Sequence, residues 1–408
     1  MHIAHFTNTY QPVVSGVVRS IETFRQSLIE LGHLVFIFAQ DAGTFEDAEP
    51  FIFRYPAFDL PGMHDFPLTI PFSPFVEKLL PSLKLDVIHS HHPFLLGHSA
   101  ARRATDLNLP LVFTFHTRYR DYSHYIPIEQ KMVKRQIDQI ISDYMRHCQH
   151  IVVPSESMRR LLAEEYGVTG HVTAVPTGIK TEPYRQADGQ AVRQEQGWGE
   201  DKVLISIGRL AEEKNWTTLL AAAIQVMQKH SNVRFVLIGE GDERKSLEKV
   251  AHNAGLADRI EFTGRLPFSK VPGYLKAADL FCFASVTETQ GLVTMEAMAA
   301  GLPVVAVDAA GTRDEVRHGQ EGLLTPNDSQ ALAQAIARVI DDDHLLYRFK
   351  QAAEQKAETF DAVGQAKRLV AVYEQAGEDK KAGLSVQVEK VKPMFQLVKD
   401  QWHKLPGF

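Results

Sequence analysis

Short apolar runs alternate with longer amphipathic stretches along the first half of the chain. The run at 2–7, HIAHFT, predicts a strand, and over 16–33 the apolar residues recur at helical spacing until Gly32 provides a natural stop. Further short apolar runs continue the scheme, at 34–39, 86–91, 110–116 and 150–155. Strands that alternate with helices predict a parallel sheet that is covered by helices on both faces.

The alternation breaks over 175–202, a polar and turn-rich stretch that we interpret as a linker with a domain entry. The scheme then restarts, with strand-like runs at 203–208, 234–239, 259–264, 280–285 and 303–308. We therefore predict an α/β protein with two doubly wound parallel-sheet domains, at 1–178 and 179–372, and a tail at 373–408. Two such halves are expected to face a cleft, and ligands of these sheets bind at the carboxyl ends of the strands.

The composition excludes several classes of function. The chain has 408 residues, enough for two ordinary domains, and its formal net charge of −6 argues against a nucleic-acid partner. Its cysteines, Cys148 and Cys282, are too few for a disulfide framework and favour a reduced, cytosolic setting. No run of ~20 apolar residues predicts a membrane-spanning helix, and we see no pattern of a secretory signal.

Two cations follow the first predicted strand of the second half. Arg209 and Lys214 would lie at the carboxyl rim of that sheet, where they could neutralise a diphosphate through charge-assisted hydrogen bonds. They could equally be surface cations that pair with Glu212 and Glu213. Spacing alone leaves both interpretations open.

Glu288 and Glu296 flank the predicted start of a helix near Gly291. The first amides of a helix have no internal acceptor and attract phosphate, and a glycine lets the phosphate approach the backbone. Glu296 could then accept hydrogen bonds from a ribose, and Glu288 from a second sugar across the phosphates. The alternative is that Glu288 is a solvated loop residue and that Glu296 only favours helix formation.

The segments GRLAEEKN, FTGRLP and ETQGLVTMEAMAAGLPVVA, at 208–215, 262–267 and 288–306, resemble the retaining nucleotide-sugar glycosyltransferases of family 4. That family has the GT-B fold of two Rossmann-like domains, and the resemblance covers most of 1–375. It implies that Arg209 and Lys214 bind the donor diphosphate and stabilise the leaving group. It also implies that Glu296 binds the ribose and Glu288 the donor sugar.

The resemblance extends to further donor contacts. It places the nucleobase near Arg265 and Leu266, and Gly291 and Leu292 at the phosphate-binding helix start. Gly16 matches the glycine loop that leads into the first helix.

In that loop many members carry two adjacent glycines, where this chain has Ser15 and Gly16. The departure leaves the contacts of the loop open, and Gly16 could also serve only a tight turn between strand and helix.

Histidines end two predicted strands of the first half. By resemblance, His116 contacts the transferred sugar and joins Arg209, Lys214 and Glu288 among the catalytic candidates, although an isolated histidine is often structural. His91 and His92 could line the cleft or could be packing residues. No ligand spacing supports a zinc site. We expect no metal or other cofactor, because in this fold cations and helix amides hold the diphosphate.

The segment 115–147 resembles the acceptor domain of bacterial glycosyltransferases that act on diacylglycerol. Its cations and aromatic residues could dock on an anionic membrane, at about 1 kcal/mol per cation. The alternative is a solvated helix face whose acidic residues offset the charge. The candidate acceptor and membrane residues are Tyr119, Arg120, Tyr122, His124, Tyr125, Lys131, Lys134 and Arg135.

These observations predict a retaining hexosyltransferase that moves glucose from UDP-glucose to a membrane lipid such as diacylglycerol. It would work peripherally, on the cytoplasmic face of the membrane. A soluble, polyprenyl-linked or wall-polymer acceptor is the nearest alternative, and a non-catalytic sugar-nucleotide or lipid-binding protein is a more distant one. The tail either returns to the first domain or touches the bilayer.

Overall fold

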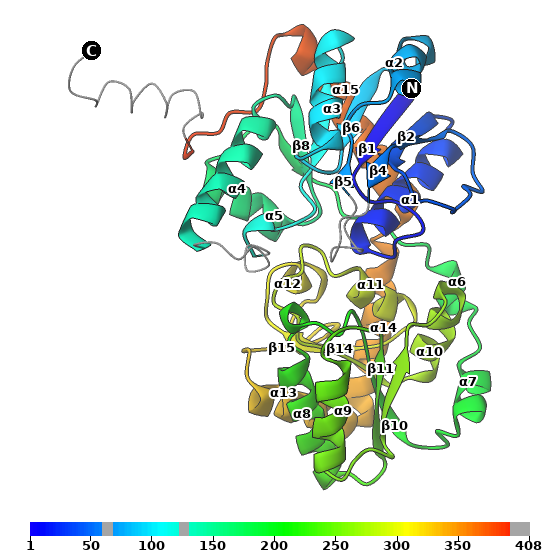
Figure 1. The fold of residues 1–408 in the computed structure, drawn as a ribbon. Coiled ribbons are helices and arrows are strands. Elements are labelled where there is room, and N and C mark those ends of the chain that lie inside the picture. The colour runs from blue at the N-terminus through cyan, green and yellow to red at the C-terminus, as the bar shows by residue number, and fades with distance from the viewer. Residues whose placement is uncertain (59–67, 122–129, 392–408) are drawn as a thin grey trace. The chain divides into compact units, whose positions relative to one another are not determined.

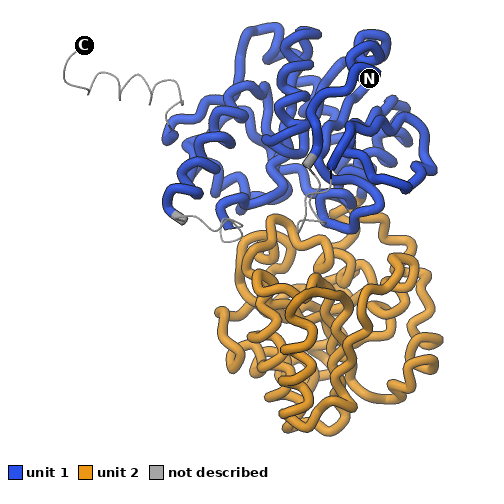
Figure 2. Tube along the Cα trace, in the orientation of Figure 1, with its two compact units in different colours: residues 1–178, 362–408 blue, residues 179–361 orange. Residues whose placement is uncertain are grey.

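The computed structural model describes residues 1–58, 68–121 and 130–391. The chain forms two compact units (Figure 2). Unit 1 comprises Met1–Gly178 and Ala362–Phe408, and unit 2 comprises Ile179–Asp361. Each unit is an α/β domain with its own parallel sheet, as the alternating apolar runs predict.

Unit 1 contains a parallel sheet in the order β3-β2-β1-β6-β7-β8-β9 (Figure 1). Its strands are β1 (His2–Thr7), β2 (Leu34–Gln40), β3 (Ile52–Tyr55), β6 (Val87–Ser90), β7 (Leu111–Thr114), β8 (His150–Val153) and β9 (Val172–Ala174). A separate antiparallel pair is formed by β4 (Ala57–Phe58) and β5 (Leu68–Thr69). The helices of the unit are α1 (Gly16–Glu30), α2 (Pro74–Leu79), α3 (Leu96–Asp106), α4 (Gln130–Met145), α5 (Glu156–Leu161) and α15 (Ala362–Lys381).

Helix α1 follows the apolar spacing of its sequence. Val18, Ile21, Phe24 and Leu28 are all buried in one core, at successive turns of the helix. Ser15 is the N-cap, and its hydroxyl accepts a hydrogen bond from the amide of Val18 at 3.3 Å. The helix therefore begins where a short strand-to-helix turn needs a capping side chain.

Helix α15 belongs to unit 1, although it follows unit 2 in the sequence. Its residues Leu369, Tyr373 and Ala376 are buried in the same core as the apolar face of α1. The predicted boundary at 372 therefore differs from the structure, in which 362–372 lie with the first domain. The stretch after α15 also returns to this unit, because Val386 donates its amide to the carbonyl of Cys148 at 2.9 Å.

Unit 2 contains a parallel sheet in the order β12-β11-β10-β13-β14-β15. Its strands are β10 (Lys202–Ile207), β11 (Val233–Ile238), β12 (Ile260–Gly264), β13 (Leu280–Phe283), β14 (Val304–Val307) and β15 (Gly322–Thr325). Its helices are α6 (Glu182–Arg185), α7 (Gly189–Gln196), α8 (Trp216–Lys229), α9 (Arg244–Asn253), α10 (Val271–Ala277), α11 (Leu292–Ala299), α12 (Thr312–Glu315), α13 (Ser329–Ile340) and α14 (Asp343–Glu358).

The sheet of unit 2 is covered on both faces. Leu204 lies in a core with helices α8 and α13, whereas its neighbour Ile205 lies in a second core with α10 and α11. The strand order reverses between β10 and β13, and this topological switch point is where doubly wound sheets bind ligands. A ligand site is therefore expected at the loops that follow β10 and β13.

Among the described residues, no helix has both the length and the apolar character needed to cross a membrane.

Candidate functional site

The loop after β10 is fastened to the end of β13. The indole of Trp216 donates to the carbonyl of Arg209 at 2.7 Å, and the side-chain Nδ2 of Asn215 donates to the carbonyl of Ala284 at 3.0 Å. Asn215 has a φ of +57°, which turns the chain from a short 3-10 turn into α8. These bonds hold Lys214, the last residue of that turn, at the switch point.

Lys214 and Glu288 form an ion pair across the switch point. The Lys214 Nζ lies 2.6 Å from the Glu288 Oε1, and both side chains are largely buried, at 22% and 16% exposed. The hydroxyl of Thr287 donates to the carbonyl of Glu213 at 3.2 Å, so the two loops are also joined by a hydrogen bond. The fold therefore brings together two of the predicted catalytic residues, which 74 positions separate in the sequence.

Gly311 supports the Glu288 loop from the other side. Its φ is +70°, and a Cβ at this position would lie 2.6 Å from the carbonyl oxygen of Glu288. The loop after β14 therefore packs closely on the loop after β13 only because residue 311 has no side chain.

Arg209 forms an ion pair with Glu213, and its side chain is 51% exposed. This is the surface pairing that the sequence left open for Arg209, whereas Lys214 pairs with Glu288. Glu243, on the loop after β11, lies near enough to feel these carboxylates, because burial, followed by the charges of Glu212 and Glu213, raises its pKa. A polyanionic ligand would have to displace some of these carboxylates from the two cations.

Helix α11 begins between the two glutamates, as the sequence predicts. Its N-cap is Gly291, with a φ of +88°, and the amide of Thr294 donates to the Gly291 carbonyl at 2.9 Å. The preceding amides, those of Leu292 and Val293, have no acceptor within the helix and point out of its N-terminus. Glu296 lies in the second turn and is 1% exposed, so it is a buried carboxylate and not a solvated helix residue.

The predicted nucleobase contacts lie elsewhere on the same edge. Arg265 follows β12, which is two strands away from β10 in the sheet, and its side chain is exposed. Leu266 is half-buried and packs on the core that contains α10 and α11. The nucleobase contact predicted for these two residues stays a prediction.

Unit 1 carries a chain of histidines at the carboxyl ends of its strands. The Nε2 of His116 lies 2.8 Å from the Nδ1 of His91, and the Nε2 of His91 lies 2.9 Å from the Nδ1 of His5. Burial lowers the pKa of His116 to about 3 and that of His5 to about 3. These rings are therefore neutral near pH 7, and each can donate through only one nitrogen.

The rest of the histidine chain was not foreseen from the sequence. His89 lies 2.7 Å from the hydroxyl of Tyr373 and 2.6 Å from that of Thr114. The signal available is the alternation of His89 and His91 along one strand, which places both side chains on the same face. His91 is thus a packing residue, and His92 accepts a hydrogen bond from the amide of Asn8 at 3.2 Å.

Gly16 is the first residue of α1 and is exposed, directly after the Ser15 cap. The serine that stands where the family often has glycine thus has a structural function of its own.

The predicted acceptor residues divide into three groups. Tyr122, His124 and Tyr125 lie outside the described residues. Tyr119 packs edge-on against Phe94, with ring centroids 5.1 Å apart, and Arg120 pairs with Asp138 and Glu165. The remaining cations lie exposed near the start of α4, and these are Lys131, Lys134 and Arg135.

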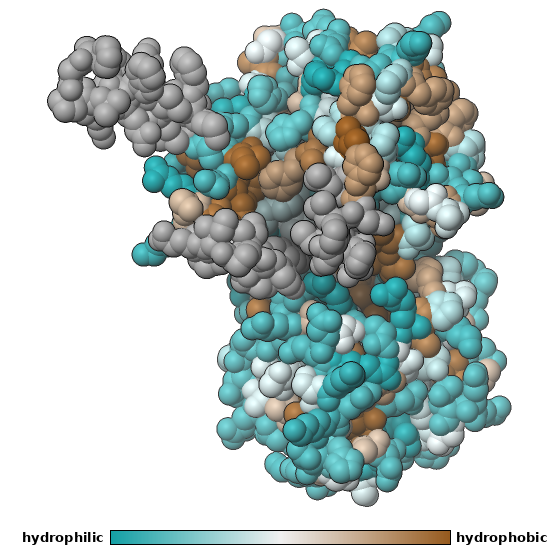
Figure 3. Space-filling view, in the orientation of Figure 1, coloured by the Kyte–Doolittle hydropathy of each residue, from teal (hydrophilic) through white to brown (hydrophobic). Residues whose placement is uncertain are grey.

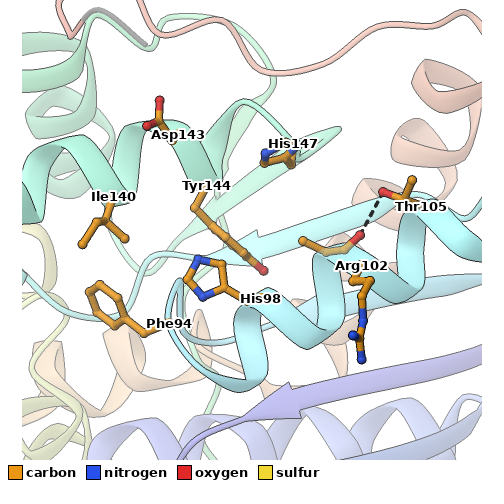
Figure 4. Close-up of a pocket in the computed structure, with 9 residues that line it drawn as sticks. Phe94, His98, Arg102, Thr105, Ile140, Asp143, Tyr144 and His147 are labelled. Atoms are coloured by element: carbon orange, nitrogen blue, oxygen red, sulfur yellow. Dashed lines mark hydrogen bonds between the residues drawn. The ribbon is translucent and has the colours of Figure 1, made fainter. Parts of the chain in front are cut away.

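Unit 1 has two cavities in this region, and the smaller one is lined by some of these residues. A cavity of about 190 Å³ is lined by Tyr119, Arg120 and Lys134, among others. A larger one, of about 420 Å³, lies between α3 and α4 (Figure 4), where Phe94, Ile140 and Tyr144 form its apolar wall. Sequence analysis did not find the larger cavity, because its walls come from two helices that are far apart along the chain.

Comparison with known proteins identifies both domains. Residues 14–183 match the model described as Glycosyltransferase Family 4, and residues 188–356 match the model described as Glycosyl transferases group 1. An α-monoglucosyldiacylglycerol synthase of Streptococcus pneumoniae is 34% identical over 75% of this chain and 71% of its own length. One of Acholeplasma laidlawii is 29% identical over 91% of this chain and 96% of its own length.

Solved structures share the fold. The crystal structure of Anabaena HepE in complex with UDP and glucose matches with a TM-score of 0.75 and 21% identity, and the match covers 92% of this chain and 99% of HepE. This likeness concerns the fold alone and agrees with the predicted GT-B architecture. Sequence relatives, family models and fold together show that this chain is a glycosyltransferase of family 4, with a C-terminal domain of the group 1 type.

Proposed function

We propose that this enzyme transfers glucose from UDP-glucose to a hydroxyl of diacylglycerol, with retention at the anomeric carbon. Two relatives that match most of the chain are named as α-monoglucosyldiacylglycerol synthases, and a protein of the same fold is solved with UDP and glucose. The observation that carries the proposal is the Lys214–Glu288 pair beside the N-terminus of α11. It combines a cation for a phosphate with an acceptor for sugar hydroxyls.

In the proposed reaction, Lys214 exchanges partners. On donor binding, its Nζ leaves the Glu288 carboxylate for an oxygen of the diphosphate, and Glu288 becomes free to accept a hydrogen bond from the sugar. Arg209 would leave Glu213 in the same way. The carboxylates thus hold the cations in place before the donor arrives, and ligand binding replaces one negative partner with another.

The charge that develops on the departing β-phosphate would be stabilised by Lys214, Arg209 and the free amides of α11. Stabilisation of this kind is worth the most where the charge appears in the transition state. Glu296 would hold the ribose from the second turn of α11. We propose that the leaving phosphate itself helps to deprotonate the acceptor hydroxyl on the same face of the sugar, without a covalent enzyme intermediate and without a metal.

His116 would contact the transferred sugar from unit 1. Because His91 occupies its Nε2, the Nδ1 of His116 is the nitrogen left for a substrate hydroxyl. The hydrogen-bonded chain through His91 to His5 fixes the orientation of the His116 ring.

The lipid acceptor would be bound by unit 1. The exposed cations Lys131, Lys134 and Arg135 on α4 would attract an anionic membrane on its cytoplasmic face, as part of a peripheral attachment. In Figure 3 the hydrophobic surface of this view lies mainly on unit 1. Exposed phenylalanines of that unit, which the sequence analysis did not single out, include Phe45, Phe51, Phe58, Phe72 and Phe75.

A panel of nucleotide-sugars, incubated with the full chain and diacylglycerol liposomes, tests the proposal by mass spectrometry of the products. We expect a monohexosyl diacylglycerol from UDP-glucose, with the α configuration by NMR. Transfer only to a soluble or polyprenyl acceptor would overturn the lipid assignment, and a β-linked product would overturn retention.

A further inference from the structure

One buried histidine nitrogen, at the end of the unit 1 sheet where the strands begin, has no hydrogen-bond partner among the described residues. His150 begins β8 and is 7% exposed. Its Nε2 lies 2.9 Å from the hydroxyl of Thr173. Its Nδ1 is buried and makes no hydrogen bond within the described part of the chain. A buried polar atom of this kind is costly unless something else binds it.

Two other ligand-type side chains lie close to His150. His171 precedes β9 with a φ of +54°, and its Nδ1 lies 2.8 Å from the Oδ2 of Asp379 on α15. One ligand atom from each of His150, His171 and Asp379 lies within 4.8 Å of the other two. Gln375 donates to the second oxygen of Asp379 at 3.0 Å, which orients the carboxylate.

We propose that His150, His171 and Asp379 bind a divalent transition-metal ion, with Zn²⁺ as the best fit. Two imidazoles and one carboxylate are ligands that Zn²⁺ accepts, and a water molecule would complete a tetrahedral site. When the Nε2 of His150 donates to Thr173, its Nδ1 keeps a lone pair for the metal. Such second-shell hydrogen bonds are the rule for metal-bound histidines.

The other buried histidine group offers a contrast. His5, His89 and His91 also lie close enough to share an ion. In that group the nitrogens already have hydrogen-bond partners, including one another, the hydroxyl of Tyr373 and that of Thr114. An ion there would have to break a network in which the ring nitrogens already have partners. An ion held by His150, His171 and Asp379 would displace the single hydrogen bond between His171 and Asp379, but it would satisfy the His150 nitrogen that lacks a partner among the described residues.

The position of the proposed site indicates a structural role. His150 and His171 stand at the amino ends of β8 and β9, whereas His116 and His91 follow the carboxyl ends of β7 and β6. The ion would therefore lie on the far edge of the sheet from the candidate catalytic histidine. It would link His171 to Asp379, 208 residues later, and so fasten α15 to the sheet of unit 1.

Sequence reasoning could not find this site. The three ligands come from two strand ends and a helix, and the first two are separated from the third by all of unit 2. No spacing motif connects them. From the sequence we expect no metal and no zinc site, so the proposed ion departs from that expectation, although it takes no part in the transfer reaction.

Zinc titration of the full chain tests the proposal. The chain is stripped with a chelator and then titrated with Zn²⁺ against a chromophoric competitor. We expect one tight site in the wild type and a loss of affinity of more than ~100-fold in His171→Gln and in Asp379→Asn, beyond the 10–100-fold typical of second-shell changes. Thr173→Val should fall within that second-shell range.

The matched control is His252→Gln, an exposed histidine of α9, which should bind zinc like the wild type. Zinc should also raise the melting temperature of the wild type and of this control but not that of His171→Gln. Circular dichroism of the stripped variants verifies their fold. No saturable binding by the stripped wild type, or undiminished affinity in both ligand variants, would overturn the proposal.

Discussion

Replacement of Lys214 by alanine tests the central ion pair most directly. The substitution removes the cation 2.6 Å from Glu288, at a place where both side chains are largely buried. A charge-assisted hydrogen bond of this kind is worth about 1.5–3 kcal/mol. If Lys214 stabilises the departing phosphate, the loss of one preorganised donor lowers kcat by about 10²–10³-fold, or roughly 2.7–4 kcal/mol.

The assay measures UDP release and glycolipid formation over a range of donor concentrations. A fall in kcat with little change in KM places the lysine in the transition state, whereas a rise in KM alone reports ground-state binding. The matched control is Lys202→Ala, which breaks an exposed pair with Asp343 (3.0 Å) in the same unit and should keep full turnover. Wild-type turnover in the folded Lys214→Ala variant would refute the leaving-group role.

Three further predictions concern stability and the membrane. Gly311→Ala forces a side chain into the carbonyl of Glu288 at a positive φ, so we expect the free energy of unfolding to fall by about 2 kcal/mol or more and turnover to be reduced. The control Gly319→Ala, with open space around it, should lower the free energy of unfolding by about 1 kcal/mol. His5 is neutral when folded and has a pKa lowered to about 3, so the unfolded state binds more protons below pH 6.5. The free energy of unfolding should therefore fall as the pH drops from 6.5 toward 3, by up to about 1.4 kcal/mol per pH unit for each such histidine, and His5→Gln should reduce that slope. Charge removal at Lys131 and Lys134 should weaken binding to anionic liposomes by about 2 kcal/mol at low salt.

Each of these predictions has a contradicting outcome. Equal losses of stability in the two glycine variants, measured by thermal unfolding, would show that the contact with the Glu288 loop is unimportant. An unchanged pH slope in His5→Gln, followed by denaturant titration, would mean that this ring does not titrate with unfolding. Liposome flotation that is indifferent to both lysines and to salt would assign membrane attachment to other residues.

The features that depend on local pattern could be predicted from the sequence. The start of α11 between Glu288 and Glu296 follows from a glycine before an apolar helical run, and the parallel sheets follow from alternation of strands and helices. For Lys214 and Glu288 the sequence could predict only that both lie at the carboxyl rim of the same sheet. Their pairing depends on the strand order that makes β10 and β13 neighbours, and that order is a property of the whole sheet.

The features that depend on long-range packing could not be predicted. A return of the tail after residue 372 to the first domain is one of the two alternatives that the sequence left open, but no pattern in α15 shows that the return begins at Ala362 or that the helix packs against α1. The same holds for the hydrogen-bonded histidines, because the neighbours of His91 come from β1 and from the loop after β7. In each case the decisive partner is more than 20 residues away.

Unit 1 is built from two segments that are separated in the sequence, and this has a consequence for biosynthesis. Its sheet is encoded before residue 178, but the helix that fills part of its core is not translated until Ala362–Lys381. A nascent chain on the ribosome must therefore keep the apolar positions of β1 and α1 partly uncovered while all of unit 2 is synthesised. Unit 2 is encoded without interruption and is free to fold first. In the interval before α15 is synthesised, chaperones could bind the uncovered apolar positions of the N-terminal half.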